Sequence, residues 1–287
     1  MGYPTEVNLA FFGQQLTNQF AMAMIKGLSF TLFAFLVMCA CLLPRGGLRA
    51  EQITVRYTEG LSHGFLAVRT LEDKLLADGE ITQVAKGDRV TSRLLFRFKD
   101  GSIYDDTAIF TQRGSFRLLS DHLVARGPSF KNPMETSLDV ATGQVTVRYT
   151  NDKGEEKVIK QRLDLPADVA NGLLITLIKH IQPTAPETTV SYVATTPAPR
   201  LVKLVIVPQR DEPLSHGTIK LKAMHYSAKV KIGGIAGLIA PLIGKQPPDT
   251  QIWVLNGHAP AFVKLEGQLY DGGPIWRVEL SSPAEFP

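Results

Sequence analysis

Few residues of this chain could do chemistry, and they are scattered. Gly60-Leu61-Ser62-His63-Gly64 matches the G-x-S-x-G pattern, in which a serine nucleophile stands on a sharp turn between a strand and a helix. That pattern requires alternating strands and helices, and no such alternation follows Ser62. The run is therefore interpreted as a glycine-rich turn. A hydrolase that uses Ser62, or Asp121 with His122, is the least favoured function.

The adjacent acids Asp105 and Asp106 offer no acid–base pair. Neighbouring residues of a strand point to opposite faces, so two adjacent carboxyl groups cannot share one substrate. We interpret both as solvated residues at the start of a strand. His216 and His225 lie nine residues apart, which places them on opposite faces of a continuous strand and argues against a shared metal.

His122 follows the alternation of Phe116, Leu118 and Val124, so we predict a position in the core or at its rim. The chain has two cysteines, Cys39 and Cys41, and both precede the predicted mature domain. No phosphate-binding or dinucleotide-binding motif occurs. We therefore predict no catalytic residue, no metal and no cofactor.

Alternating apolar residues predict a mainly β fold. Leu94, Phe96 and Phe98 alternate with other residues, and Tyr226 to Ile232 repeat the pattern. Turn sequences such as Lys99-Asp100-Gly101-Ser102 separate the runs. Short turns join antiparallel strands, because parallel strands need a long crossover. We predict a strongly curved antiparallel sheet, a half-barrel or open barrel, covered by one or two short helices.

Two segments interrupt the strand pattern. Apolar residues recur at helical spacing after Asp168 and end before Pro183, so we predict a helix at about 168–181. The stretch 183–200 is rich in proline and threonine, yet Val190, Tyr192 and Ala194 alternate within it. We interpret it as an edge strand of the same domain rather than as a linker.

An uncharged segment, 232–244, has two interpretations. It is too short to cross a bilayer, and a buried helix is its commoner fate. Alternatively, residues 234–244 form an apolar flap over a cavity. In that case the helix, the flap and a tryptophan would line a ligand pocket. The candidate ligand-binding residues are Leu173, Leu177, Ile235, Leu238, Leu242 and Trp253.

The N-terminal region resembles an export signal. Lys26 precedes 17 uncharged residues, Gly27 to Leu43, and a short polar segment ends at Ala50. We predict that residues 1–50 are an N-terminal extension and signal peptide, with Met24 as the true start and cleavage near Ala50. The single β-rich domain then spans 51–287, in the periplasm or outside the cell. An uncleaved membrane anchor is the alternative, and lipidation at Cys41 is less favoured.

Charge limits the partners. Of 31 basic and 27 acidic residues, three and one lie in residues 1–50, which leaves a net charge of +2 for the remainder. No dense block of lysine and arginine occurs there, so we expect no nucleic-acid partner. Any contact with a membrane would be peripheral.

Several strings resemble an uncharacterised family of secreted bacterial proteins. They are Phe110 to Val124 followed by Gly127-Pro-Ser-Phe130, then Leu165 to Leu173, and the tail Gly244 to Asp249 with Gly273 to Trp276. The family has no assigned activity. More distantly, the chain is similar in fold to the curved sheets of lipoprotein carriers, which implies no catalytic residue.

Two functions are therefore favoured. The first is an exported binding protein that holds a lipid or other amphiphile against the concave, apolar face of its sheet. The second is a structural envelope module that binds a protein partner and no small ligand.

Overall fold

All described strands belong to one antiparallel sheet. The computed structural model describes residues 52–151, 153–196, 198–216, 219–231, 246–257 and 260–281. Within these ranges the elements are β1 (Ser62–Arg69), β2 (Leu75–Lys86), β3 (Arg89–Phe98), β4 (Ile103–Arg113), β5 (Ser115–Arg126), β6 (Met134–Asp139), β7 (Gln144–Thr150), β8 (Glu156–Arg162), α2 (Leu174–Ile178), β9 (Thr188–Ala194), β10 (Arg200–His216), β11 (Ile219–Lys231), β12 (Thr250–Leu255), β13 (Ala261–Gln268) and β14 (Ile275–Ser281).

The sheet consists of two meanders that meet at the first and last strands. Strands β1 to β8 follow one another outward from the middle of the sheet, and β9 to β14 return from the other edge. We call these groups the first and the second bank. Antiparallel pairing of β1 with β14, with Val68 opposite Val278, joins them. The edges of the sheet are β8 and β9.

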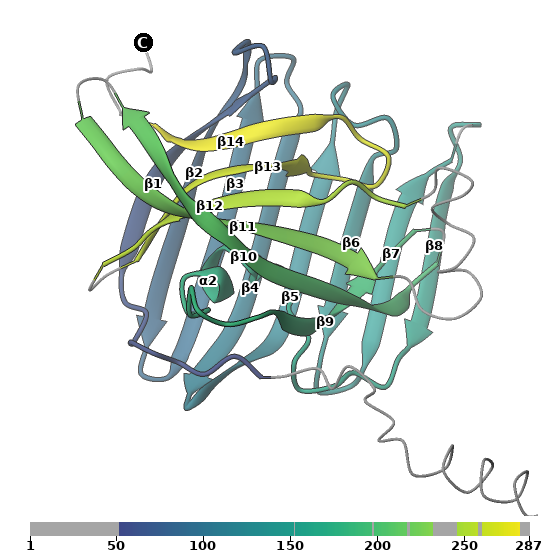
Figure 1. Cartoon of the computed structure of the whole chain (residues 1–287). Helices are drawn as coiled ribbons and strands as arrows, with labels where there is room; N and C mark the ends of the chain where they lie inside the picture. The colour runs from purple at the N-terminus through teal and green to yellow at the C-terminus, as the bar shows by residue number, and fades with distance from the viewer. Residues whose placement is uncertain are drawn as a thin grey trace, which may run out of the picture. The chain divides into compact units, whose positions relative to one another are not determined.

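The sheet curves so strongly that it packs against itself. Figure 1 shows the second bank lying across one face of the first bank, with α2 between them. Buried side chains from both banks form one cluster, including Phe96 and Phe110 of the first bank and Ile206, Tyr226 and Ile252 of the second. The predicted curved antiparallel sheet is confirmed, and the sheet is open.

The alternation in the sequence corresponds to the two faces. Phe96 and Phe98 lie in the core, and Leu94 packs against it, as predicted. Arg93 and Arg97, between them, form ion pairs with Asp105 and Glu80 on the other face. This division places the apolar groups between the banks and keeps the charges near water.

The helix is shorter than the predicted 168–181, because only Leu174–Ile178 are helical. Gly172 has a φ of 65°, which ends any helix that would approach from Asp168. A Cβ atom at Gly172 would also lie 2.5 Å from the Asp121 Oδ1 atom. The apolar residues of this segment are nevertheless buried, with Leu173, Leu177 and Ile181 at 1%, 3% and 4% exposure. The apolar spacing therefore predicted correctly which residues are buried, but it predicted a helix that is too long.

The segment before α2 covers the free edge of β9. The Ala170 amide donates to the Ser191 carbonyl at 2.9 Å, and the Ser191 amide donates to Asp168. The Asn171 side chain accepts from the Val193 amide at 2.8 Å and donates to the Val193 carbonyl at 3.0 Å. The predicted edge strand is thus present, and side chains pair part of its edge.

We predict that Asn171→Ala lowers the free energy of unfolding by about 2–4 kcal/mol, because it leaves the buried amide and carbonyl of Val193 unpaired. Urea denaturation measures the change. The matched control is Asn256→Ala, since Asn256 is exposed and should change stability little. Equal stabilities for the two variants would contradict the role of Asn171.

Candidate functional site

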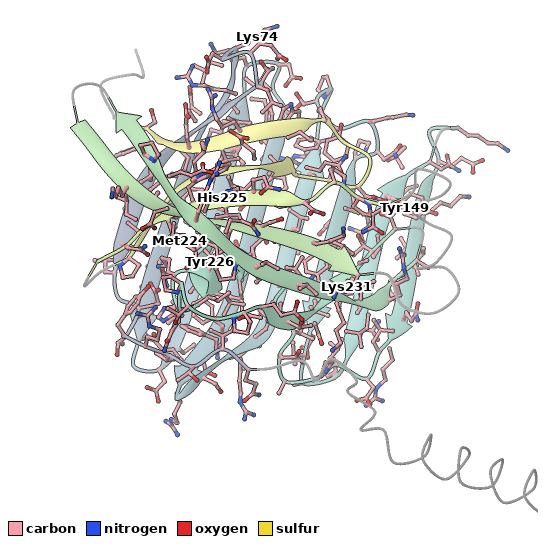
Figure 2. The ribbon with its side chains drawn as sticks, in the orientation of Figure 1. Lys74, Tyr149, Met224, His225, Tyr226 and Lys231 are labelled. Carbon is pink, nitrogen blue, oxygen red and sulfur yellow. The ribbon has the colours of Figure 1, made fainter. Side chains whose placement is uncertain are left out.

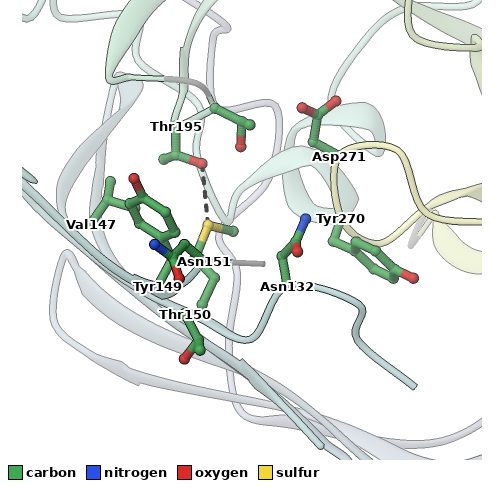
Figure 3. Close-up of a pocket in the computed structure, with 10 residues that line it drawn as sticks. Asn132, Val147, Tyr149, Thr150, Asn151, Thr195, Tyr270 and Asp271 are labelled. Atoms are coloured by element: carbon green, nitrogen blue, oxygen red, sulfur yellow. Dashed lines mark hydrogen bonds between the residues drawn. The ribbon is translucent and has the colours of Figure 1, made fainter. Parts of the chain in front are cut away.

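A pocket lies where the two banks meet. It has a volume of about 250 Å³ and is walled by β6 and β7 on one side and by the segments after β9 and β13 on the other. Figure 3 shows its side chains, which come from four parts of the chain. The described residues that line it are Asn132, Met134, Val147, Tyr149, Thr150, Asn151, Thr195, Thr196, Tyr270 and Asp271.

Contacts across the pocket fix its walls. The Thr195 hydroxyl donates to the Met134 sulfur at 3.6 Å, which ties the segment after β9 to β6 (Figure 3). The Tyr270 hydroxyl donates to the Ser129 carbonyl at 3.3 Å. This bond ties the segment after β13 to the connection between β5 and β6. The pocket thus has walls that are held from both banks.

An aromatic cluster lies behind Tyr270. Phe130, 2% exposed, packs with its ring centroid 5.3 Å from that of Tyr270 and 6.2 Å from that of Trp276. Phe98 lies 5.2 Å from Trp276. Such edge-to-face and tilted pairs add to the energy of apolar burial. They join β3 to β14 and so hold the β13–β14 connection at the pocket.

Two aspartates point inward from the first bank, where Asp121 is buried and Asp106 is half-buried. Burial raises the pKa of Asp106 to about 6, and burial together with the negative charge of Asp106 raises the pKa of Asp121 well above its usual value. The two carboxyl groups lie close enough to shift each other's pKa. Two like charges so close together disfavour ionisation of both groups, which favours a state in which one keeps its proton.

The acid pair contradicts two expectations from the sequence. Asp106 is not a solvated residue, because it shares the inward direction of Ala108 and Phe110. A register shift opposite Ile109 and Phe110 leaves Leu119 unpaired. This bulge reverses the alternation of β5, so Asp121 points inward and the predicted core residue His122 points outward to Glu135, at 3.1 Å.

Tyr192 links the acid pair to the pocket electrostatically. Burial raises the pKa of Tyr192, and the negative charges of Asp121, Asp106 and Asp271 raise it further. Tyr192 belongs to β9 and packs against the core. Asp271 also lines the pocket, so Tyr192 is near both the acid pair and one wall of the pocket.

A second buried network fastens the residues that precede β1. The Glu59 carboxylate, 6% exposed, lies 2.7 Å from the Lys179 ammonium and 2.9 Å from His180 Nε2. His180 Nδ1 accepts from the Arg56 amide at 3.2 Å, so Nε2 carries the proton that Glu59 accepts. The His180 ring stacks on Tyr57 at 4.0 Å.

The charges of this network are set by its contacts. Burial alone would raise the pKa of Glu59, but the hydrogen bond from His180 and the positive charge of Lys179 hold it below its usual value. Burial lowers the pKa of His180 and outweighs the favourable bond to Glu59. The buried network joins residues 56–59 to Lys179 and His180, which follow α2. We therefore interpret its role as structural.

Of the predicted ligand-binding residues, the three that the structure describes do not line this pocket. The Leu177 amide donates to the Leu173 carbonyl, and both side chains are buried in the core between the banks. Trp253 lies on the opposite face of the second bank, where its ring stacks on His225 at 4.5 Å. Met224 and Tyr226, the neighbours of His225 on β11, are buried (all three are labelled in Figure 2). Ile235, Leu238 and Leu242, with the rest of the predicted flap 234–244, lie outside the described residues.

The residues considered for a hydrolase are also apart. The Ser62 hydroxyl, near the start of β1, lies 3.5 Å from the Gln83 side-chain oxygen. Asp121 points into the core, whereas His122 lies on the outer face with Glu135. No group of three or more metal-ligating side chains occurs among the residues that the structure describes. In the same residues, no helix has the length and apolarity that a membrane crossing requires.

Comparisons with known proteins add little. No protein-family model matches the chain, and no curated protein matches it. Among solved structures, the chain is similar to a crystal structure of MucB in complex with MucA(peri), with 13% identity over 79% of this chain and 89% of that chain, at a TM-score of 0.17. At that TM-score the similarity carries no argument about fold or function. The resemblance to secreted bacterial proteins therefore stays a prediction.

We predict that Asp106→Asn flattens the pH dependence of stability. A pKa raised from 3.8 to about 6 means that the wild type loses stability as pH rises from about 4 to about 6, by about 3 kcal/mol for Asp106. Asparagine does not ionise, so the variant should not lose this stability. Its free energy of unfolding should therefore rise relative to that of the wild type between about pH 4 and about pH 6. Urea denaturation at several pH values measures it.

Asp105→Asn is the matched control with the opposite sign. The Arg93 guanidinium binds Asp105 through two hydrogen bonds, of 2.8 and 2.6 Å, and holds its pKa below the usual value. Its contribution to stability is present above pH 4 and is lost as pH falls. If the stability of Asp106→Asn depends on pH as that of the wild type does, Asp106 does not have a raised pKa.

We predict that Glu59→Gln lowers the free energy of unfolding by about 3 kcal/mol, because the nearly buried Lys179 loses its counter-charge. Glu135→Gln is the control, since Glu135 also contacts a histidine and a cation but is 40% exposed. Its loss should cost less than about 1 kcal/mol. Similar urea midpoints for the two variants would exclude the fastening role of Glu59.

Proposed function

We propose that this chain is an exported binding protein that holds one end of a small amphiphilic ligand in the pocket between its banks. The pocket itself carries the proposal, because its walls come from four separate segments that tertiary contacts hold in place. Pockets of this kind, part apolar and part polar, are the usual form of ligand sites. Met134, Val147 and Tyr149 provide the apolar part, and the threonine and asparagine side chains provide the polar part.

The size of the pocket restricts the ligand. At about 250 Å³ it is smaller than the roughly 300–1,000 Å³ of sites that bury a drug-sized molecule. The space between the banks deeper in the fold is filled by Leu173, Leu177 and Ile178. A headgroup or a short chain therefore fits this site better than a whole lipid enclosed by the sheet. The remainder of the ligand would lie outside the described walls.

Export is part of the proposal. Its support is the basic residue Lys26, the 17 uncharged residues after it and the break at Pro44 before Ala50. The mature chain would then begin just before Ile53, whose carbonyl accepts a hydrogen bond from the Phe116 amide. Removal of residues 1–50 would leave that contact intact.

One observation favours partner binding as a second candidate function. Strand β8 forms the far edge of the first bank, and six of its seven residues are exposed. Segment 168–171 covers the other edge, at β9, whereas no described segment pairs with the outer side of β8. An extended segment of a partner could add there as a further strand. Lysines at 157 and 160 would oppose non-specific pairing.

We predict that Thr195→Trp blocks the pocket. The indole would replace a small side chain in the wall and occupy the cavity. Titration of the exported protein with N-phenyl-1-naphthylamine, an uncharged fluorescent amphiphile, should show saturable binding that the variant weakens at least tenfold.

Thr91→Trp is the matched control, because Thr91 is exposed on β3 and should leave binding unchanged. Urea denaturation of both variants separates a blocked pocket from a damaged fold. Binding by Thr195→Trp at the wild-type affinity would exclude this pocket as the site, and absence of saturable binding by the wild type would count against the proposed function.

A further inference from the structure

The described lining of the pocket carries one acidic side chain and no basic one. That side chain is Asp271, and the other described lining residues offer amide and hydroxyl groups or apolar surface. Asp106 and Asp121 are near Tyr192 of β9, as Asp271 is, because the negative charges of all three raise the pKa of Tyr192. We propose that the pocket selects a positively charged group, an ammonium or guanidinium, as the head of its ligand; this inference rests on the proposed function.

The nearby basic side chains do not cancel this charge. Lys157 stands opposite Tyr149 in the β7–β8 pairing, but its ammonium lies 2.8 Å from the Glu155 carboxylate. Arg148 lies on the outer face, with contacts to Glu135 at 2.9 Å and to Glu156 at 3.1 Å. Lys131 and Lys153 adjoin lining segments in sequence, are exposed, and do not line the pocket.

The aromatic walls suit a cation as well. Tyr149 lines the pocket from β7, and Tyr270 lines it from the connection between β13 and β14 (Figure 3). The faces of aromatic rings attract cations, more strongly where water is partly excluded. The bond from Tyr270 to Ser129 and the packing of its ring on Phe130 hold that wall in place before a ligand arrives. Such preorganisation reduces the entropy that binding would cost.

The carboxylate of Asp271 supplies the charge partner. Asp271 is exposed while it lines the pocket, so its charge can reach a headgroup there and is screened by added salt. An anionic headgroup would meet Asp271 with no cation among the described lining residues to compensate. The selection therefore depends on repulsion of anions as well as on attraction of cations.

The test compares two amphiphiles that differ in the charge of the headgroup. Decyltrimethylammonium and decyl sulfate, each below its micellar concentration, compete with N-phenyl-1-naphthylamine on the exported full-length protein. We expect the cation to bind at least tenfold more tightly than the anion. Asp271→Asn should reduce this ratio at least fivefold, and added salt should also reduce it.

Asp88→Asn is the control, because Asp88 is a surface carboxylate paired with Arg113 and should not change the ratio. Equal affinities, or tighter binding of decyl sulfate, would overturn the inference while leaving the proposed function in place. Failure of all three amphiphiles to bind would overturn both. A third arm uses Nα-acetyl-lysine methylamide: binding as tight as that of decyltrimethylammonium would retain the selection for cations but identify a protein side chain as its source.

Discussion

The pairing of the first strand with the last is the constraint on which the rest of this structure depends. Strands β1 and β14 are separated by nearly the whole described chain, and their antiparallel register joins two meanders into one sheet. Without that pairing each bank would have one further edge and half a core. Because such non-local contacts are made at a high cost in chain entropy, folding of this protein should be slow compared with that of a helical domain of equal length.

The curvature that follows from this pairing creates both the core and the pocket. Phe98 and Phe130 of the first bank meet Trp276 of the second, and this contact brings the β13–β14 connection to the inner face of β6 and β7. The same closure buries Asp106 and Asp121, which costs stability at neutral pH.

Local patterns in the sequence predicted local structure well. The alternation around Phe96 identified the inner face of β3, and the alternation from Tyr226 identified that of the second half of β11. Predictions failed where a single residue altered the phase of the pattern. One unpaired residue, Leu119, exchanged the directions of Asp121 and His122, and the positive φ of Gly172 shortened the helix.

The candidate site was beyond reach of such patterns. Its lining residues come from four segments between Asn132 and Asp271, and no one segment carries a recognisable motif. Their proximity depends on the register of several strand pairs and on how far the sheet curves. Trp253 shows the same limit. The sequence placed it on a strand, but it did not show that Trp253 lies on the face away from the core. Strand alternation alone would have placed Asp106 on the inner face, because Asp106 lies four residues before Phe110 and so points the same way.

The most direct test of this account is a cross-link between the first and last strands. In a chain with Cys39 and Cys41 replaced by serine, Val68→Cys and Val278→Cys place two thiols directly opposite each other. We expect a disulfide to form on air oxidation and to raise the urea midpoint, as observed by mass spectrometry and denaturation. Val68→Cys with Glu279→Cys places the thiols on opposite faces and should not form one. Formation of the second disulfide as readily as the first would contradict the pairing of β1 with β14.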